Sequence, residues 1–188
     1  MADIKAVGDL GPGRNFTYKG ELYSVLDILH NKTAMRGMIV KIKAKNLRTG
    51  SISDMTFNGD DKVELIFLDK RDMTYLYDDG NNLVFMNQET YDQVELPKER
   101  LKWESNFLTT DSVVKITYYG DEIMGVELPV KVTLEVTATE DAVKGDTINK
   151  AMKDATLETG FVIKVPMFVK IGNKVIVRTD TGEYDSRA

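Results

Sequence analysis

The chain has 188 residues, of which 42% are hydrophobic and 29% charged, and its formal net charge is −5. This is an ordinary soluble globular composition, and no apolar run approaches the roughly 18–20 residues that a membrane-spanning helix needs. Cysteine is absent and histidine occurs once, so a disulfide, a zinc site or a Cys/His nucleophile pair has almost nothing to build from. The N-terminus lacks the basic-then-apolar pattern of a signal peptide, and we expect a cytoplasmic protein.

After a turn-rich start, the first clear element is a β-hairpin around the loop Asn31–Gly37. The flanking segments, Leu22–His30 and Met38–Lys45, are rich in β-branched and large apolar residues. The second segment alternates with a period of two, which is typical of a half-buried strand. One face carries Met38, Val40, Ile42 and Ala44, and the other carries Ile39, Lys41, Lys43 and Lys45. The pattern therefore predicts a hairpin with a basic outer face.

The charge of this hairpin is opposite to that of the chain as a whole. No acidic residue lies between Asp27 and Asp54. The same interval contains the basic residues Lys32, Arg36, Lys41, Lys43, Lys45 and Arg48. Residues 1–64 have a net charge of +2, residues 65–128 of −7 and residues 129–188 of 0. This distribution favours a protein that touches nucleic acid with selected faces and argues against one that coats it along its whole length.

Short predicted strands continue through the rest of the chain, with turns roughly every eight to twelve residues. The strands expected are 16–18, 51–57, 63–68, 73–77, 83–86, 113–119, 123–128, 130–137, 161–165, 166–169 and 175–179. With no long amphipathic helix among them, the pattern is typical of small barrels. We expect an all-β protein of three consecutive barrels, covering residues 1–64, 65–128 and 129–188.

Three stretches allow more than one interpretation. Residues 96–103 have the composition of a helical turn. The acidic turn Asp78–Asn82 could suggest a calcium site of the EF-hand type, with Glu89 at the twelfth position of the loop. The positions of the glycine and of the other ligands do not fit an EF-hand, however, and we expect a plain turn and no metal. Residues 139–155 have helical propensity but are interrupted by Gly145-Asp146-Thr147, so helix and loop both remain open.

Motifs in all three parts of the chain match one known family. They are Lys45–Gly50, Thr74–Gly80, Phe85–Tyr91, Lys144–Thr147, Lys153–Gly160, Val165-Pro166 and the tail Gly182–Arg187. With these motifs the chain resembles the bacterial translation elongation factor P family over essentially its full length. The resemblance implies an SH3-like (KOW-like) N-terminal domain followed by two OB-fold domains in an L-shaped arrangement. It also implies that Gly145-Asp146-Thr147 lies in a loop.

The function that the resemblance implies is non-enzymatic and requires no cofactor. Such a factor would bind the 70S ribosome beside the peptidyl-site tRNA, contact ribosomal RNA, and help peptide bonds form where consecutive prolines stall synthesis. We expect a monomer without a membrane partner. Proline is a secondary amine with a fixed ring, so a prolyl chain end is poorly placed for reaction. A factor that holds the tRNA end in a productive geometry lowers the barrier without supplying an acid or base.

The resemblance assigns roles to four groups of residues. They are Lys32, Thr33, Ala34, Met35, Arg36 and Gly37 at the tRNA CCA end, Lys41, Lys43, Lys45 and Arg48 on the RNA backbone, Gly145, Asp146 and Thr147 at the exit-site codon, and Tyr184 and Arg187 in the tail. These residues also have purely structural interpretations. The basic residues of the hairpin can be solvated surface charges, Asp146 can cap a turn, and Tyr184 can be a core residue. We expect His30 to end its strand without a chemical role.

The tip of the loop departs from the family pattern. The family commonly has Pro-Gly-Lys-Gly there, with a modified lysine, whereas this chain has Thr33-Ala34-Met35-Arg36-Gly37. Ungapped alignment places Met35 at the tip, and a shift of one residue places Arg36 there, as in the elongation factor P-like paralogues. We favour Arg36, because its planar charged group suits phosphate and ribose better than a thioether does.

Two other classes of function are weighed against this one. A general single-stranded nucleic-acid binder built on OB folds would need exposed aromatic residues along a basic groove, which the acidic central third does not favour. An enzyme would need a catalytic constellation, and the chain has no histidine pair and no Gly-rich phosphate loop. An elongation factor P-like paralogue with a different stall preference is a further alternative.

Overall fold

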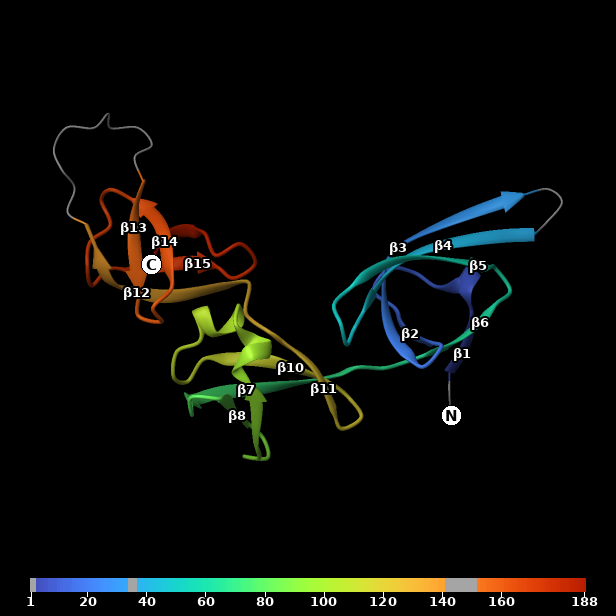
Figure 1. Ribbon diagram of the computed structural model, residues 1–188, viewed down its shortest axis with the longest axis horizontal. Helices are drawn as coiled ribbons and strands as arrows, with labels where there is room; N and C mark the ends of the chain where they lie inside the picture. The colour runs from blue at the N-terminus through green and yellow to red at the C-terminus, as the bar shows by residue number, and fades with distance from the viewer. Residues whose placement is uncertain (1–2, 34–36, 141–151) are drawn as a thin grey trace. The chain divides into compact units, whose positions relative to one another are not determined.

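The computed structural model of the protein (Figure 1) describes residues 3–33, 37–140 and 152–188. The chain divides into two compact units, one of Met1–Lys70 with Thr117–Met124 and the other of Arg71–Ile116 with Gly125–Ala188. The described residues form three β-sheets and three short 3-10 helices, and these are η1 (Val7–Asp9), η2 (Lys98–Leu101) and η3 (Glu104–Phe107). The expectation of an all-β fold is confirmed.

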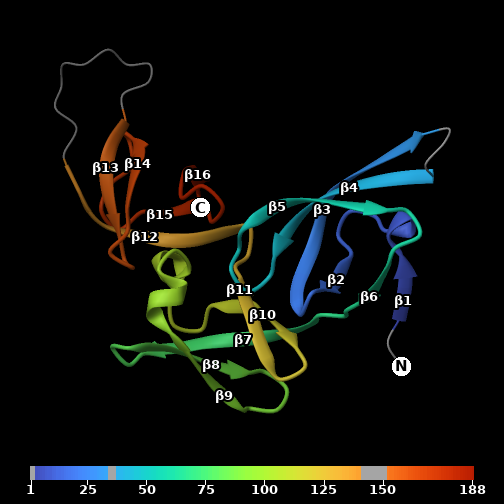
Figure 2. The same ribbon diagram turned by 45° about the vertical axis from the view of Figure 1, so that its right-hand side comes forward.

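The first sheet belongs to the first unit and has six strands in the order β1-β6-β2-β3-β4-β5. Their bounds are β1 (Asp3–Ala6), β6 (Lys62–Leu65), β2 (Asn15–Tyr18), β3 (Glu21–Thr33), β4 (Gly37–Asn46) and β5 (Ile52–Asn58). The sheet curls around a core to which every strand from β2 to β6 contributes (Figure 2). The buried core residues are Val7, Leu10, Phe16, Val25, Val40, Ile42, Ala44, Phe57, Val63 and Leu65.

Local turn chemistry fixes how this sheet begins. The turn between β2 and β3 has positive φ at both central residues, 51° at Lys19 and 81° at Gly20. Two successive residues with positive φ make the tight turn that matches the right-handed twist of a hairpin. The β3–β4 pair then extends outward from the curled part of the sheet, as Figure 1 shows.

The second sheet has the order β11-β10-β7-β8-β9. Its strands are β11 (Glu122–Glu127), β10 (Val113–Tyr119), β7 (Asp69–Asp78), β8 (Asn82–Asn87) and β9 (Gln93–Pro97). The helical turn expected at residues 96–103 is present as η2, which directly follows β9, and it continues into η3.

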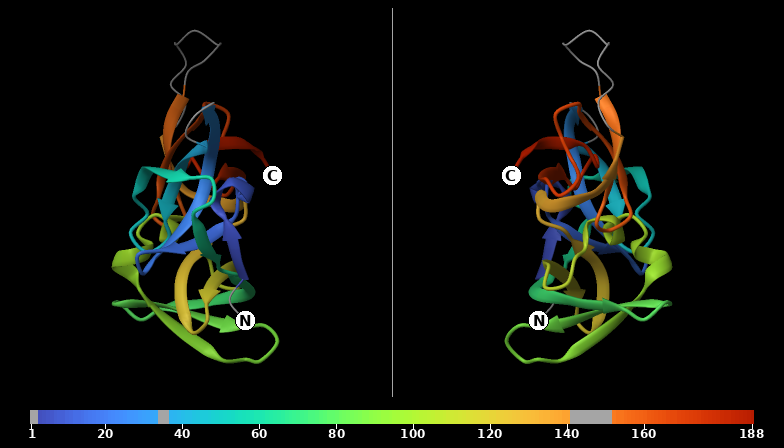
Figure 3. Two further views of the ribbon diagram at one scale, coloured as in Figure 1. Left: turned by 90° about the vertical axis from the view of Figure 1, so that its right-hand side faces the viewer. Right: turned by 90° about the vertical axis from the view of Figure 1, so that its left-hand side faces the viewer.

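The third sheet has the order β14-β13-β12-β15-β16 and lies in the second unit. Its strands are β14 (Val162–Pro166), β13 (Met152–Leu157), β12 (Lys131–Thr139), β15 (Lys174–Arg178) and β16 (Tyr184–Arg187). Strands β13 and β14 form a regular antiparallel pair, which is visible side by side in Figures 2 and 3. Every strand of this sheet faces one core, to which Phe107 of η3 also contributes.

The expected division into three domains at residues 64 and 128 remains a prediction. The three sheets follow one another in chain order, with strands in residues 3–65, 69–127 and 131–187. The two compact units divide the chain differently, because the tip of the β10–β11 hairpin, Thr117–Met124, groups with the first unit.

Several sequence-based expectations differ from the structure. The helical alternative for residues 139–155 is wrong at both of its described ends, because Thr139 ends β12 and Met152 begins β13. The strand expected at 166–169 is a turn after Pro166, in which the Val169 N–H bonds to the Pro166 carbonyl at 3.1 Å. Strands β1, β9, β13 and β16 were not expected.

Candidate nucleic-acid interface

The side chains of β4 alternate between core and solvent, as the sequence predicts. The core-facing ones are Val40, Ile42 and Ala44, and the exposed ones are Lys41, Lys43 and Lys45. We refer to Lys41, Lys43 and Lys45 as the lysine row. Because β4 pairs with β3 on one side and β5 on the other, its backbone is held on both sides, and the row stands on a fixed surface.

A bulge in β3 decides which face of the hairpin Lys32 occupies. The register between β3 and β4 shifts between Val25 and Asp27, so one extra residue is inserted there. Beyond the bulge, Lys32 pairs with Met38, which packs against the first core. Directly paired residues share a face of the sheet. Lys32 therefore lies on the face opposite the lysine row.

The three lysines of the row have different neighbours. Lys43 pairs with Asp27 on one side and Asp54 on the other, so two carboxylates offset its charge. The neighbours of the other two are uncharged: Leu29 and Thr56 beside Lys41, and Ser24 and Ile52 beside Lys45. In the described part of the chain, none of the three forms an ion pair. Lys41 and Lys45 consequently present the more available positive charge.

Arg48 has a protein partner in the structure. Its Nε and Nη2 atoms each donate to a carboxylate oxygen of Glu122, both at 2.9 Å, and its Nη1 donates to the Gly20 carbonyl at 3.3 Å. The hydrogen bond to Glu122 raises the pKa of Arg48. Both residues belong to the first unit but are 74 positions apart, so no local sequence pattern could have revealed the pair. An RNA contact by Arg48 remains a prediction.

The turn that carries Arg48 is organised by Asn46. The Asn46 side-chain oxygen accepts the backbone N–H groups of Arg48 at 2.9 Å and Thr49 at 3.0 Å, and its amide donates to Glu21 at 3.1 Å. Asn46 is buried, with 6% of its surface exposed. A buried polar side chain with its bonds satisfied specifies one turn geometry, which places Arg48 at Glu122.

The tip of the hairpin is described only where the two strands meet it. Thr33 and Gly37 form the last backbone pair, and Gly37 has a positive φ of 76°. Ala34, Met35 and Arg36 lie outside the described residues, as does the exit-site loop Gly145-Asp146-Thr147. The roles of these two loops stay predictions.

The two tail residues differ in exposure. Tyr184 is half-buried and packs against the third core, whereas Arg187 is exposed and pairs with Val175. Between them, Asp185 accepts a hydrogen bond from Lys131 Nζ at 2.7 Å, which lowers the pKa of its carboxyl group. The packing of Tyr184 is a structural role, and Arg187 is the more accessible of the two to RNA.

The acidic turn between β7 and β8 is closed by its own carboxylates. Asp79 accepts the backbone N–H groups of Asn81 and Asn82, at 2.8 and 2.6 Å, which lowers its pKa. Asp78 accepts from Gly80 at 2.8 Å and pairs with Lys98, which lowers its pKa. These oxygens are engaged as in a plain hairpin turn, and no group of three potential metal ligands occurs among the described residues.

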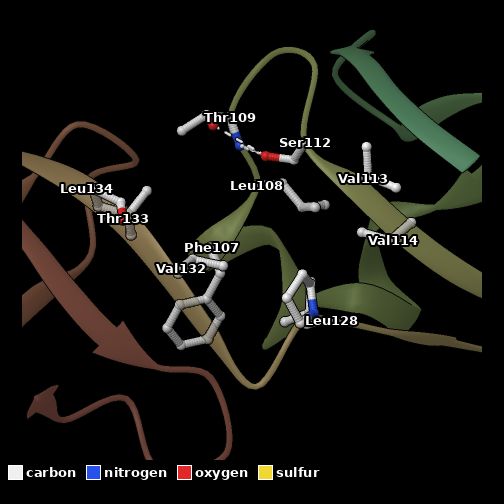
Figure 4. Close-up of a pocket in the computed structure, with 11 residues that line it drawn as sticks. Phe107, Leu108, Thr109, Ser112, Val113, Val114, Leu128, Val132, Thr133 and Leu134 are labelled. Carbon is white, nitrogen blue, oxygen red and sulfur yellow. Dashed lines mark hydrogen bonds between the residues drawn. The ribbon is translucent and has the colours of Figure 1, made fainter.

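A pocket of about 200 Å³ lies in the second unit (Figure 4). Its lining side chains are apolar or hydroxyl-bearing and include no charged group; among them are Phe107, Leu108, Val132 and Leu134. Two of the polar groups in the lining bond to each other, because the Thr109 N–H donates to the Ser112 hydroxyl at 3.0 Å. The lining thus holds no acid or base that could activate its hydroxyl groups.

In the described part of the chain, no helix is both long enough and apolar enough to cross a membrane.

Comparison with known proteins covers the whole chain. Residues 6–63 match the elongation factor P KOW-like domain, residues 68–126 the elongation factor P OB domain, and residues 132–187 the elongation factor P C-terminal domain. The chain is 49% identical to elongation factor P of Mycoplasmoides gallisepticum over 188 residues, which cover 100% of both chains. It is 48% identical to elongation factor P of Mesoplasma florum over 183 residues, which cover 97% of this chain and 99% of the relative.

Among solved structures, the fold is similar to that of eukaryotic translation initiation factor 5A from Methanococcus jannaschii. The TM-score is 0.54 and the identity 18%, over 68% of this chain and 95% of the other. This likeness supports the fold alone. The curated relatives and the three domain matches, which follow the order of the three sheets, show that the chain belongs to the elongation factor P family of translation elongation factors.

Proposed function

We propose that this translation factor binds the 70S ribosome beside the peptidyl-site tRNA and places the tip of the β3–β4 hairpin against the tRNA CCA end. The observation that carries the proposal is the lysine row, which lies on a strand paired on both sides in the same hairpin as the tip. Cations on a rigid surface bind phosphates and release counterions without losing much conformational freedom. The hairpin, which we call the arm, is thus suited to an RNA backbone.

We propose that the factor acts by positioning and not as an enzyme. A tRNA end held in a near-attack geometry reacts faster, because its orientational freedom is already lost on binding and this loss no longer adds to the activation free energy. A poorly placed prolyl end gains most from such help, and consecutive prolines are therefore the stalls that we expect the factor to relieve. In this scheme the factor works as a monomer in the cytoplasm.

The loop Gly145-Asp146-Thr147 and the tail residue Arg187 supply the second part of the proposal. Glycine permits close approach of a backbone, and Asp146 and Thr147 can bond to base edges or 2′-hydroxyls. We assign this loop to the exit-site codon, with Arg187 on a phosphate. Contacts at both ends of the chain would fix the direction in which the arm enters the ribosome.

The first prediction concerns the tip residue. Arg36→Ala, and the double change of Met35 and Arg36 to Ala, should lower the rate of polyproline synthesis at least about tenfold, because the charged fork that orients the RNA end is lost. The measurement is synthesis of a polyproline reporter in a reconstituted translation system. Met35→Ala alone separates the two candidate tip residues, since it should keep most of the rate if Arg36 is the contact.

Lys102→Ala is the matched control, because Lys102 is an exposed cation in the acidic central third. Full rescue by the double tip variant would contradict the tip assignment. Strong binding to free RNA oligomers by the wild type would favour a general single-stranded nucleic-acid binder instead. The intact mass of the protein from its native host would show whether Arg36 carries a modification.

A further inference from the structure

Two segments outside the arm pack around Met38, which lies one residue after the start of β4. A Cβ atom built on Gly8 would lie 2.3 Å from the terminal methyl carbon of Met38, and one built on Gly59 would lie 2.6 Å from the same carbon. Neither glycine is among the residues with positive φ, so backbone conformation does not require glycine at either position. Crowding favours glycine instead: besides the Met38 methyl carbon, the Gly59 carbonyl oxygen would lie 3.1 Å from a Cβ atom on Gly8, and the Met38 Cβ atom 3.1 Å from one on Gly59.

Backbone hydrogen bonds connect the same three places. The Gly59 N–H donates to the Met38 carbonyl at 2.7 Å, and the Gly8 N–H donates to the Gly59 carbonyl at 3.0 Å. Val7, which is fully buried, anchors η1 in the first core, and its N–H bonds to the Asp61 carbonyl at 2.7 Å. A continuous chain of bonds therefore runs from β4 through the β5–β6 turn to η1.

The other strand of the arm reaches the same point through His30. Its Nε2 atom lies 3.0 Å from the Gly8 carbonyl oxygen, and a ring tautomer with the proton on Nε2 donates this bond. His30 pairs with Val40 and so stands on the core face of the arm, as Met38 does. Gly8 is thus bound to both strands, to β3 by a side-chain hydrogen bond and to β4 by packing.

We propose that Gly8, Gly59, Met38 and His30 form a clamp that sets the direction of the arm, and that they are positioning residues for the tip. The role assigned to the tip rests on the proposed function above. The pair formed by Lys32 and Met38 is adjacent to the last pair before the loop, so a rotation at the clamp displaces the whole tip. Misplacement of a reacting group by about 1 Å can cost about a hundredfold in rate.

The clamp predicts that Gly8→Ala is more harmful while Met38 is present than without it. In the wild-type background, the new methyl group must displace the Met38 side chain, and we expect amide-exchange protection of β3 beyond the bulge and of β4 up to Val40 to fall about tenfold. In a Met38→Ala background, the closest contact is gone and the Gly59 carbonyl oxygen, 3.1 Å from the Cβ position, stays near, so Gly8→Ala should cause a clearly smaller further loss. Gly11→Ala is the control, because no atom lies within 4 Å of its Cβ position and its φ is not positive.

The functional readout separates positioning from folding. Gly8→Ala should slow polyproline synthesis about tenfold while ribosome affinity stays within about twofold, because the lysine row is untouched. His30→Ala should act in the same direction and His30→Gln should recover the rate, since the glutamine amide can donate to the Gly8 carbonyl. This milder pair keeps the test decisive if Gly8→Ala lowers the yield of folded protein.

Three outcomes would overturn the clamp: unchanged exchange in Gly8→Ala, an equal loss from Gly8→Ala with and without Met38, or altered exchange with full polyproline synthesis while Arg36→Ala still slows synthesis. Amide exchange is measured on the free protein, so it tests the clamp without the ribosome. A failure of the proposed function would appear instead as full synthesis by the Arg36→Ala variant, with the exchange coupling between Gly8 and Met38 intact.

Discussion

Gly182 lies in a narrow space between two aromatic rings of the second unit. A Cβ atom at this position would lie 3.0 Å from the Trp103 ring and 3.1 Å from the Phe161 ring, and φ is 74°. Trp103 itself is fixed, because its indole N–H donates to the Thr179 carbonyl at 2.8 Å and its ring packs edge-on against Phe107 and Phe161. Conformation and space both select glycine here.

Gly182→Ala should therefore lower the free energy of unfolding by about 3 kcal/mol, combining left-handed backbone strain of about 1–2 kcal/mol with overpacking of about 1–3 kcal/mol. Gly160→Ala is the matched control: its φ is 84° but no atom lies within 4 Å of its Cβ position. We expect only the strain of about 1–2 kcal/mol there. Urea unfolding followed by the fluorescence of Trp103, the single tryptophan, measures both. Equal losses would show that crowding is unimportant.

At the scale of the element, the lysines of the row on β4 differ in their cross-strand neighbours: Lys43 lies between two aspartates, whereas Lys41 and Lys45 have uncharged neighbours. Lys41→Ala should weaken ribosome binding about fivefold and reduce the salt dependence of log K by about one phosphate contact. Lys43→Ala should change affinity less than about twofold, since Asp27 and Asp54 already offset its charge. Titrating both variants against ribosomes at two salt concentrations is the measurement. A larger effect at Lys43 than at Lys41 would contradict this distinction.

The arm also shows how far sequence reasoning reaches. Alternation along Met38–Lys45 predicted both faces of β4 correctly, because one face of the strand is buried and the other solvated. The same reasoning could not place Lys32 on the opposite face. That depends on the bulge between Val25 and Asp27, which was not predicted from the sequence.

Sequence reasoning was weakest where the decisive partner is distant along the chain. Strand β1 is short and exposed in its first three residues, and its pairing with β6 alone defines it. In the candidate interface, the cations were found from composition, but the bond of Arg48 to Glu122 and that of His30 to Gly8 depend on the folded chain. The residues of the tip and exit-site loops were identified by resemblance, and their contacts remain predictions.

At the scale of the whole molecule, several exposed carboxyl groups depend on cations or backbone amides brought together by folding. Their pKa values lie below the ordinary 3.8, and they are Asp78 beside Lys98, Asp79 beneath the backbone N–H groups of Asn82 and Asn81, Asp180 beside Arg178, and Asp185 beside Lys131. A pKa lowered by folding adds stability above the unfolded value, which is lost as the pH falls through the folded value.

The free energy of unfolding should accordingly decline as the pH drops below about 3.8. Asp79→Asn keeps an oxygen that can accept the turn N–H groups but removes one titrating group. Its stability curve should be flatter than that of the wild type below this pH and parallel above it. Chemical unfolding at a series of pH values gives both curves, and parallel curves throughout would contradict the role of Asp79.

The alternation of side chains along β3 and β4 has a consequence for the reach of the arm. Side chains change face at every residue of a strand, so adding one pair of residues to the arm would turn the tip over as well as move it outward. Only two pairs at a time preserve its orientation, and each such addition lengthens the arm by about 7 Å. If the orientation of the tip is kept, the length of the arm can therefore change only in steps of about 7 Å.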